Sequence, residues 1–247
     1  MHTHNTYNSA AYTTAFSYID PNQNFSINDQ LRMDIRAIEF DVHWYFSMDG
    51  WPWEWGNRPL LCHGQDNHLG CSSYDRHLQK GVDELNSFIR SNRSEVVILY
   101  VEEHLSGHYQ EALNVIKGTL GDLIYRPSTN CADAPINVSR QQILSAGKNI
   151  VLWTGSCGGG EWGSWFHIKN NAVPEENSSK FTSYPGCGSP AISSDDYLNK
   201  MVRFYEDKTN LTSLFGGGSG STTTANIPEM LKCGVNLVGM DKISPTD

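Results

Sequence analysis

The sequence contains no long hydrophobic run and little positive charge. No stretch of roughly 18 or more apolar residues occurs, so no membrane-spanning helix is predicted. Lys and Arg number 18 against 27 Asp and Glu, which gives a formal net charge of -9. This acidic balance argues against nucleic acid as a partner and against adsorption to anionic membrane surfaces. Any contact with lipid is therefore expected to be apolar or aromatic.

Motifs of nucleotide-binding enzymes and of zinc hydrolases are also absent. No G-x-G-x-x-G opens a predicted helix, so an open nucleotide-binding sheet would lack its phosphate loop. No C-x-x-C pair occurs, and no group of histidines has zinc-ligand spacing, which argues against a zinc hydrolase.

The six cysteines form an even set, which favours disulfide bonds and predicts a secreted protein. Five N-x-S/T sequons agree with secretion. No signal peptide opens the chain, and Met1-His2-Thr3-His4 is interpreted as a trimmed or engineered start. The expected disulfide pairs are Cys62 with Cys71, Cys157 with Cys187, and Cys131 with Cys233.

Apolar runs alternate with helical periodicity along the chain. Strands are predicted at 37–44, 60–64, 95–104, 149–154 and 235–241, and helices at 26–33, 76–91, 107–120, from 139, at 193–206 and at 227–233. Aromatic residues 44–55 and glycine-rich residues 155–190 are predicted as loops. This order predicts an α/β fold with a parallel sheet. Polar residues at several strand ends favour a distorted TIM-type (β/α) barrel, and the length fits a single domain spanning 1–247.

The run Ala37-Ile38-Glu39-Phe40-Asp41-Val42-His43-Trp44 carries two carboxylates on one face of its strand. Alternate side chains share a face, so Glu39 and Asp41 point one way and the apolar residues between them point the other. Like charges at this spacing repel unless a cation neutralises them, and a hard divalent metal is one such cation. A half-exposed antiparallel strand with a polar outer face is the alternative.

Further polar residues stand at the ends of other predicted strands. Asn5, Glu39, Asp41 and Glu102 supply four oxygen ligands, a set that suits calcium better than magnesium or zinc. His4 and His63 offer a base and an acid. With no obvious Ser or Cys nucleophile, this set fits displacement at phosphorus by a substrate hydroxyl or water.

Four pieces of sequence in this order resemble the X domain of phosphatidylinositol-specific phospholipase C. They are His4-Asn5-Thr6-Tyr7, Arg36 to Asp41, Cys62-His63-Gly64 and Val97 to His104, and Val238-Gly239-Met240-Asp241 resembles the final strand of that domain. The resemblance implies a distorted β/α barrel that cleaves a phosphodiester by attack of a neighbouring hydroxyl, giving a cyclic phosphate. Its calcium-dependent branch matches Asn5, Glu39, Asp41 and Glu102. It also implies that His4 contacts the phosphoryl oxygens or acts as base, and that His63 protonates the leaving oxygen.

Two departures from that family leave the substrate open. The strand 149–154 has no basic residue, and tryptophans are dense near the expected mouth. Trp51, Trp53, Trp153 and Lys242 are the candidate substrate-binding residues, and the tryptophan-rich loop is a candidate for peripheral membrane contact. The expected substrate is a phosphatidylinositol-type lipid or a glycan-linked phosphodiester, bound by a monomer. A catalytically inactive barrel that serves as a carbohydrate-binding module is the alternative.

Overall fold

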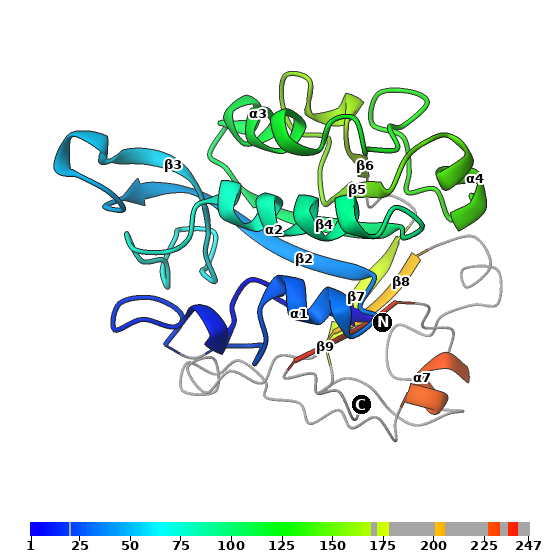
Figure 1. Ribbon diagram of the computed structural model, residues 1–247, viewed down its shortest axis with the longest axis horizontal. Helices are drawn as coiled ribbons and strands as arrows, with labels where there is room; N and C mark the ends of the chain where they lie inside the picture. The colour runs from blue at the N-terminus through cyan, green and yellow to red at the C-terminus, as the bar shows by residue number, and fades with distance from the viewer. Residues whose placement is uncertain (20, 169–171, 178–200, 206–226, 233–236, 242–247) are drawn as a thin grey trace.

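One mixed sheet forms the centre of the molecule (Figure 1). The computed structural model describes residues 1–19, 21–168, 172–177, 201–205, 227–232 and 237–241. The strands are β1 (His2–Thr3), β2 (Ala37–Ser47), β3 (Gly56–Leu61), β4 (Val97–His104), β5 (Ile150–Thr154), β6 (His167–Ile168), β7 (Ala172–Asn177), β8 (Met201–Tyr205) and β9 (Leu237–Met240). They lie in the order β6-β5-β4-β2-β1-β9-β8-β7, with β3 paired to β2.

Every pair along that order is parallel, and β1 joins the two halves of the sheet. The short N-terminal strand pairs with β2 through His2 and Ala37, and with β9 through His2 and Gly239. Among the described strands only β3 runs antiparallel, so β2 and β3 form a hairpin that extends beyond the sheet (Figure 1). The first strand therefore places the residues that follow it between the ends of β2 and β9.

The helices are α1 (Ile27–Arg32), α2 (Leu78–Ser91), α3 (Tyr109–Leu120), α4 (Arg140–Ser145) and α7 (Ile227–Lys232). Ser26 caps α1 by accepting a hydrogen bond from the Asp29 amide, and Ser139 with Gln142 forms a capping box on α4. The apolar residues of α2 and α3 repeat at helical spacing and are buried. Figure 1 shows both helices on one side of β2 and β4.

Two apolar clusters lie on opposite faces of the strands. Ile38, Phe40 and Val42 of β2 belong to the larger cluster, which they share with the buried residues of α1, α2 and α3. The smaller cluster contains Ala37, Tyr100, Ala134, Trp153 and Leu237. Strand register aligns Glu39 with Tyr100, Tyr100 with Trp153 and Trp153 with His167. The side chain of Glu39 therefore lies in one row across the sheet with Tyr100 of β4, Trp153 of β5 and His167 of β6.

Several predicted elements are confirmed, with small shifts at their ends. Three predictions are wrong. The aromatic segment 44–55 is strand up to Ser47, because β3 pairs with it residue by residue. The predicted loop 155–190 contains β6 and β7. The predicted helix 193–206 contains β8 at Met201–Tyr205, a five-residue segment too short for its periodicity to separate strand from helix.

The parallel sheet is confirmed, whereas closure into a barrel stays a prediction. The edges of the described sheet are β6 and β7, and among the described residues no pairing joins them. No helix in the described ranges is long and apolar enough to cross a membrane.

The disulfides correct part of the predicted pairing. Cys62 bonds to Cys71, as predicted, with 5.3 Å between their Cα atoms. Cys131 bonds to Cys157 rather than to Cys233, because their Cα atoms lie 5.4 Å apart. The predicted Cys157–Cys187 pair is therefore wrong as well. Cys187 and Cys233 themselves lie outside the described residues.

Candidate metal and phosphodiester site

Three carboxylates converge where β2 and β4 lie side by side. Asp41 and Glu102 occupy the same register position of this parallel pair, and Glu39 precedes Asp41 on the same face. One oxygen from each of Glu39, Asp41 and Glu102 lies within 4.8 Å of the others. Glu39 is fully buried and Asp41 is 5% exposed. Such a group is stable only when its negative charge is compensated.

The neighbouring negative charges affect the pKa of Asp41. Burial raises the pKa of this carboxyl well above its usual range, and the charges of Glu102 and Glu39 raise it further. The Tyr7 hydroxyl donates a hydrogen bond to Asp41 Oδ2 at 2.8 Å, which partly opposes the rise. The Tyr7 ring is fully buried against Phe40, with ring centroids 6.3 Å apart.

The Asn5 side chain can turn either its amide oxygen or its amide nitrogen toward the Asp41 carboxylate. When its amide nitrogen donates to Asn22 Oδ1 at 3.2 Å, its amide oxygen faces the Asp41 carboxylate, 2.9 and 3.1 Å from the two oxygens. Without a cation, the amide must turn over and donate to Asp41 instead. A cation beside the Asp41 carboxylate would stabilise the first orientation. Three carboxylates and one amide oxygen form an all-oxygen set that fits a hard divalent ion such as calcium.

His4 and His63 stand at opposite ends of a polar chain beside the carboxylates. His4 Nδ1 lies 3.0 Å from Asp241 Oδ1, and Asn22 Nδ2 donates to Asp241 Oδ2 at 3.0 Å. Asn8 Nδ2 lies within hydrogen-bond distance of both Asn22 Oδ1 and His63 Nδ1, at 2.5 and 3.1 Å. The chain thus links residues that follow β1, β3 and β9.

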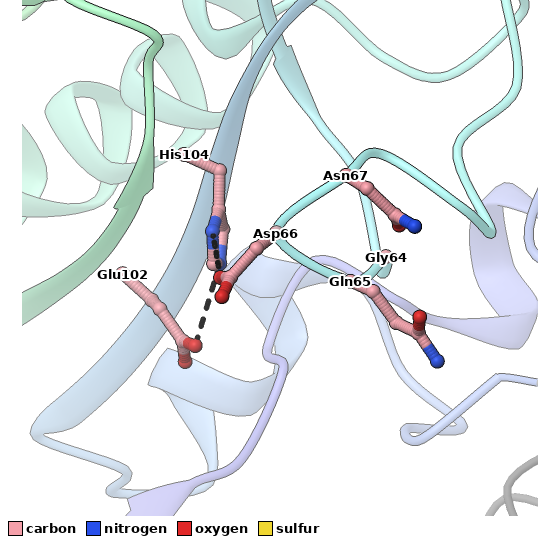
Figure 2. A pocket seen from close by; sticks show the side chains of 6 residues that line it. All are labelled: Gly64, Gln65, Asp66, Asn67, Glu102 and His104. Carbon is pink, nitrogen blue, oxygen red and sulfur yellow. Dashed lines mark ion pairs between the residues drawn. The ribbon is translucent and has the colours of Figure 1, made fainter.

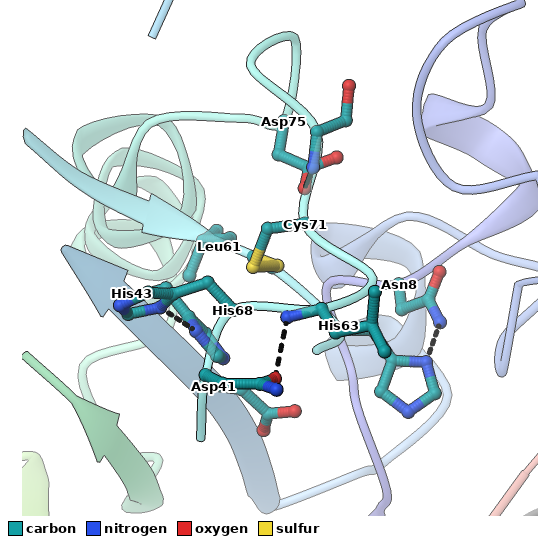
Figure 3. Close-up of a disulfide and its surroundings, with 12 residues drawn as sticks. Asn8, Asp41, His43, Leu61, His63, His68, Cys71 and Asp75 are labelled. Atoms are coloured by element: carbon teal, nitrogen blue, oxygen red, sulfur yellow. Dashed lines mark hydrogen bonds between the residues drawn. A yellow bond between two sulfur atoms is a disulfide. The ribbon is translucent and has the colours of Figure 1, made fainter. Parts of the chain in front are cut away.

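A disulfide fixes the loop that carries His63. Figure 3 shows His63 turned toward Asn8 beside the Cys62–Cys71 bond. The Cys62 amide donates to the Asp41 carbonyl at 3.2 Å, so the loop begins at the level of the carboxylates. Gly70 has a φ of +111°, and a Cβ there would lie 2.8 Å from the His63 carbonyl oxygen. Only glycine allows the chain to return so close to His63.

An open depression of about 520 Å³ lies next to Glu102, lined by Gly64, Gln65, Asp66, Asn67, Glu102 and His104 (Figure 2). His104 Nδ1 lies 3.0 Å from Asp66 Oδ1, and its Nε2 lies 3.4 Å from Glu102 Oε1. Burial lowers the pKa of His104, but the hydrogen bond and charge of Glu102, together with the charges of Asp66 and Glu103, more than offset this and leave the pKa raised. The depression therefore presents amides, acids and one imidazole.

A second histidine supports the ring of His104. His43 stacks on it with centroids 4.3 Å apart and an interplanar angle of 27°. His43 Nδ1 lies 2.9 Å from His68 Nδ1, as Figure 3 shows. Burial lowers the pKa of His43 to about 3, and the neighbouring histidines add to the effect, so its ring is neutral at physiological pH. His43 also approaches Cys62 and Cys71, but their sulfurs are bonded to each other.

The predicted substrate-binding residues do not form one group. Trp153 is 1% exposed and belongs to the smaller apolar cluster, and its Nε1 has no hydrogen-bond partner among the described residues. Trp51 and Trp53 lie on the β2–β3 hairpin, where they are 65% and 78% exposed and stack with centroids 5.1 Å apart. Lys242 lies outside the described residues.

The sequence matches one family model over its whole length. Residues 1–247 match the model described as the Rv2075c PI-PLC-like domain. The chain belongs to this family. Two Mycobacterium tuberculosis proteins, the uncharacterized proteins Rv2075c and MT2135, are each 30% identical to it over 268 residues. These alignments cover 99% of the chain but 54% of each relative, so the chain spans about half the length of those relatives.

Solved structures of low sequence identity share the fold. The phosphatidylinositol-specific phospholipase C from Listeria monocytogenes aligns with a TM-score of 0.58 and 15% identity, covering 99% of this chain and 88% of that one. A calcium-dependent phosphoinositol-specific phospholipase C from Pseudomonas sp. aligns with a TM-score of 0.50 and 12% identity, covering 98% and 90%. The α/β fold with its parallel sheet is therefore similar to those of phospholipase C barrels.

Sequence reasoning missed several residues that hold this site together. Tyr7 was part of the H-N-T-Y run, but nothing in the sequence indicated its contact with Asp41. Asn8 and Asn22 lie in a polar loop without periodicity, so no local signal could place them. Asp241 ends the last strand, and its position there was the available signal for a contact with His4.

Proposed function

We propose that this protein is a calcium-dependent phosphodiesterase of the phosphatidylinositol-specific phospholipase C type. The convergence of Glu39, Asp41 and Glu102 within 4.8 Å of one another carries the proposal. Membership of the PI-PLC-like family supports phosphodiester chemistry. The calcium-dependent phospholipase C from Pseudomonas sp., which has a similar fold, supports calcium as the ion.

Asn5, Glu39, Asp41 and Glu102 would hold the ion. Calcium, when bound, supplies positive charge that lowers the pKa of a coordinated hydroxyl and stabilises negative charge on a phosphate oxygen. The Tyr7 hydroxyl keeps Asp41 in place. The backbone amide of Asn5 donates to Glu39 Oε2 at 3.3 Å, which fixes the deepest carboxylate.

His4 is the proposed base or phosphoryl contact. Asp241 accepts a hydrogen bond at 3.0 Å from its Nδ1, so the Nε2 atom carries the lone pair that can accept a proton from the attacking hydroxyl. Asn22 holds Asp241 from the other side at 3.0 Å. The carboxylate therefore orients His4 and stabilises the imidazolium that proton transfer creates.

His63 is the proposed acid that protonates the leaving oxygen. Asn8 contacts its Nδ1 at 3.1 Å, and the disulfide loop fixes its backbone. Its Nε2 lies 3.3 Å from the terminal atom of the Asn5 side chain that faces away from Asp41, so the proton would be delivered beside the carboxylate cluster. The product is a cyclic phosphate when a substrate hydroxyl attacks and an open phosphate monoester when water attacks.

A phosphatidylinositol-type lipid is the proposed substrate. Eight exposed large hydrophobic residues stand in the segment that follows β1, in the β2–β3 hairpin and in the segment that follows β3: Phe16, Ile19, Phe46, Trp51, Trp53, Trp55, Leu69 and Tyr74. These side chains would contact the apolar part of a lipid surface around the site. The depression beside Glu102 is lined by side chains that bind hydroxyl groups, which favours a glycan-linked phosphodiester as the second candidate.

Cleavage of a substrate panel tests the proposal. The panel contains phosphatidylinositol in vesicles, phosphatidylcholine in vesicles and a phosphodiester-linked glycan, with phosphorus NMR as the readout. We expect a cyclic phosphate from phosphatidylinositol in calcium and no product in a chelator. No cleavage of any diester in calcium would contradict the function, whereas cleavage of the glycan alone would replace the substrate and keep the chemistry.

A further inference from the structure

We propose that His104 is a positioning residue that holds Glu102 in its metal-binding orientation and ties it to the loop that lines the depression. This inference rests on the proposed metal site and goes beyond it, because it assigns a role to a side chain outside the four proposed ligands. It also predicts that the loop residue Asp66 affects metal binding without contacting the metal.

The contacts of His104 run in two directions. Its Nε2 lies 3.4 Å from Glu102 Oε1, and its Nδ1 lies 3.0 Å from Asp66 Oδ1. Figure 2 shows the ring between the two carboxylates at the wall of the depression. Both ring nitrogens therefore face acids, one at the metal site and one on the loop.

Burial makes His104 the fixed member of this group. Its side chain is 12% exposed, whereas the side chains of Glu102 and Asp66 are 45% and 96% exposed. His43, which is fully buried, stacks on the His104 ring at 4.3 Å. Rotation of His104 would break this stack, so the ring presents its nitrogens in one direction.

Glu102 needs such support more than the other two carboxylates do. Glu39 and Asp41 are buried and lie on β2, whereas Glu102 is a long, half-exposed side chain on β4. Ordering an exposed glutamate costs conformational entropy when the metal binds. A neighbour that already restricts the glutamate removes part of this cost, and loss of such a neighbour typically weakens metal binding about 10- to 100-fold.

The loop contact should act through the same ring. Asp66 lies between Gln65 and Asn67 on the disulfide-bonded loop. An ion pair with so exposed a carboxylate contributes little, about two- to fivefold in an equilibrium constant. Because its only proposed route to the metal is His104, its effect should vanish when the imidazole is removed.

Calorimetric titration with calcium, without substrate, tests the inference. The variants are His104→Ala, His104→Gln, Asp66→Asn and the double variant Asp66→Asn/His104→Ala. Gln places an amide nitrogen near the position of Nε2, so it can still donate to Glu102. Asp49→Asn is the matched control, since Asp49 also lies near a histidine, at 3.7 Å from His77, and its change alters the charge equally. Urea unfolding in chelator measures stability separately.

We expect His104→Ala to weaken calcium binding about 10- to 100-fold and His104→Gln to restore most of the affinity. Asp66→Asn should weaken binding about two- to fivefold, but not in the His104→Ala background, and Asp49→Asn should leave affinity unchanged. Wild-type affinity in His104→Ala would overturn the inference and leave the proposed function intact. An absence of calcium binding by the wild-type protein would overturn both.

Discussion

The Tyr7 hydroxyl donates a hydrogen bond to Asp41 Oδ2 at 2.8 Å, although the two residues lie 34 positions apart in the chain. Tyr7 follows β1 and Asp41 lies in β2, so the contact depends on the parallel pairing of these strands. It fixes a buried carboxylate whose negative charge is destabilised by the neighbouring charges of Glu102 and Glu39.

Tyr7→Phe is therefore expected to weaken calcium binding about tenfold, because Asp41 loses the donor that orients it. Tyr18→Phe is the matched control: its buried hydroxyl donates to the Leu61 carbonyl at 2.6 Å and does not contact Asp41. Calorimetry on both variants gives the comparison. Equal calcium affinities for the two variants would show that Tyr7 contributes packing alone.

His63→Ala should separate catalysis from metal binding. Loss of a general acid lowers turnover about 10²- to 10⁴-fold, while calcium affinity should stay close to that of the wild-type protein because His63 is not a proposed ligand. His108→Ala is the control, since this histidine precedes α3, where its side chain pairs with Glu111. Turnover and calcium titration are measured on the same preparations. A His63→Ala protein with full turnover would remove His63 from the proposed mechanism.

The hairpin tryptophans are expected to bind the lipid surface. Trp51 and Trp53 are largely exposed. Transfer of one such side chain from water into an apolar phase raises the partition coefficient about tenfold. Trp51→Ala/Trp53→Ala should therefore reduce sedimentation with neutral vesicles by at least about tenfold. Cleavage of a water-soluble inositol phosphodiester should be unchanged.

Leu231→Ala serves as the control for this surface, since Leu231 is 50% exposed on α7, away from the hairpin (Figure 1). If the two tryptophans instead stack on sugar, the double tryptophan variant and the Leu231→Ala control will bind vesicles equally. Quenching of their fluorescence by a phosphodiester-linked glycan would then favour the second candidate substrate.

Asp75 should make stability depend on pH. Burial raises its pKa to about 7, opposed in part by the hydrogen bond from the Ser72 amide. Between about pH 4 and pH 7, the Asp75 carboxyl is therefore protonated in the folded protein and ionised in the unfolded chain. Stability from this group is present at low pH and is lost as pH rises toward 7.

Asp75→Asn tests this sign. The amide keeps an acceptor for Ser72 and cannot ionise, so the variant should match the wild-type protein at about pH 3, below the unfolded pKa, and be more stable at pH 8. Each unit of pKa shift corresponds to ~1.4 kcal/mol in the free energy of unfolding. Urea denaturation at both pH values measures it, and a wild-type protein that is more stable at pH 8 than Asp75→Asn would reverse the assignment.

The sequence was sufficient to predict that the carboxylates meet. The two-residue period of a strand places Glu39 and Asp41 on one face, and burial of the alternate residues confirms that face. A buried run ending in charge indicated Glu102, and the parallel register then aligned it with Asp41. These features are local or follow from strand pairing, so periodicity is enough to find them.

Contacts made by loops could not be predicted in the same way. Asn22 lies in a loop without a repeating pattern, yet it contacts Asp241 from 219 positions away. The partner of Cys131 depends on how two loops fold beside each other, which spacing along the chain does not encode. The sequence predicts helix where β8 lies, because a segment of five residues is too short to separate the two periods.

Calorimetric titration of the wild-type protein and of Glu39→Gln with calcium tests the central claim most directly. Glu39 is fully buried beside Asp41, so an ion held by this cluster must contact or neutralise it. The account predicts one calcium ion per chain for the wild-type protein, much weaker binding by Glu39→Gln, and loss of phosphodiester cleavage in chelator. Full cleavage in chelator together with no heat of calcium binding would contradict it.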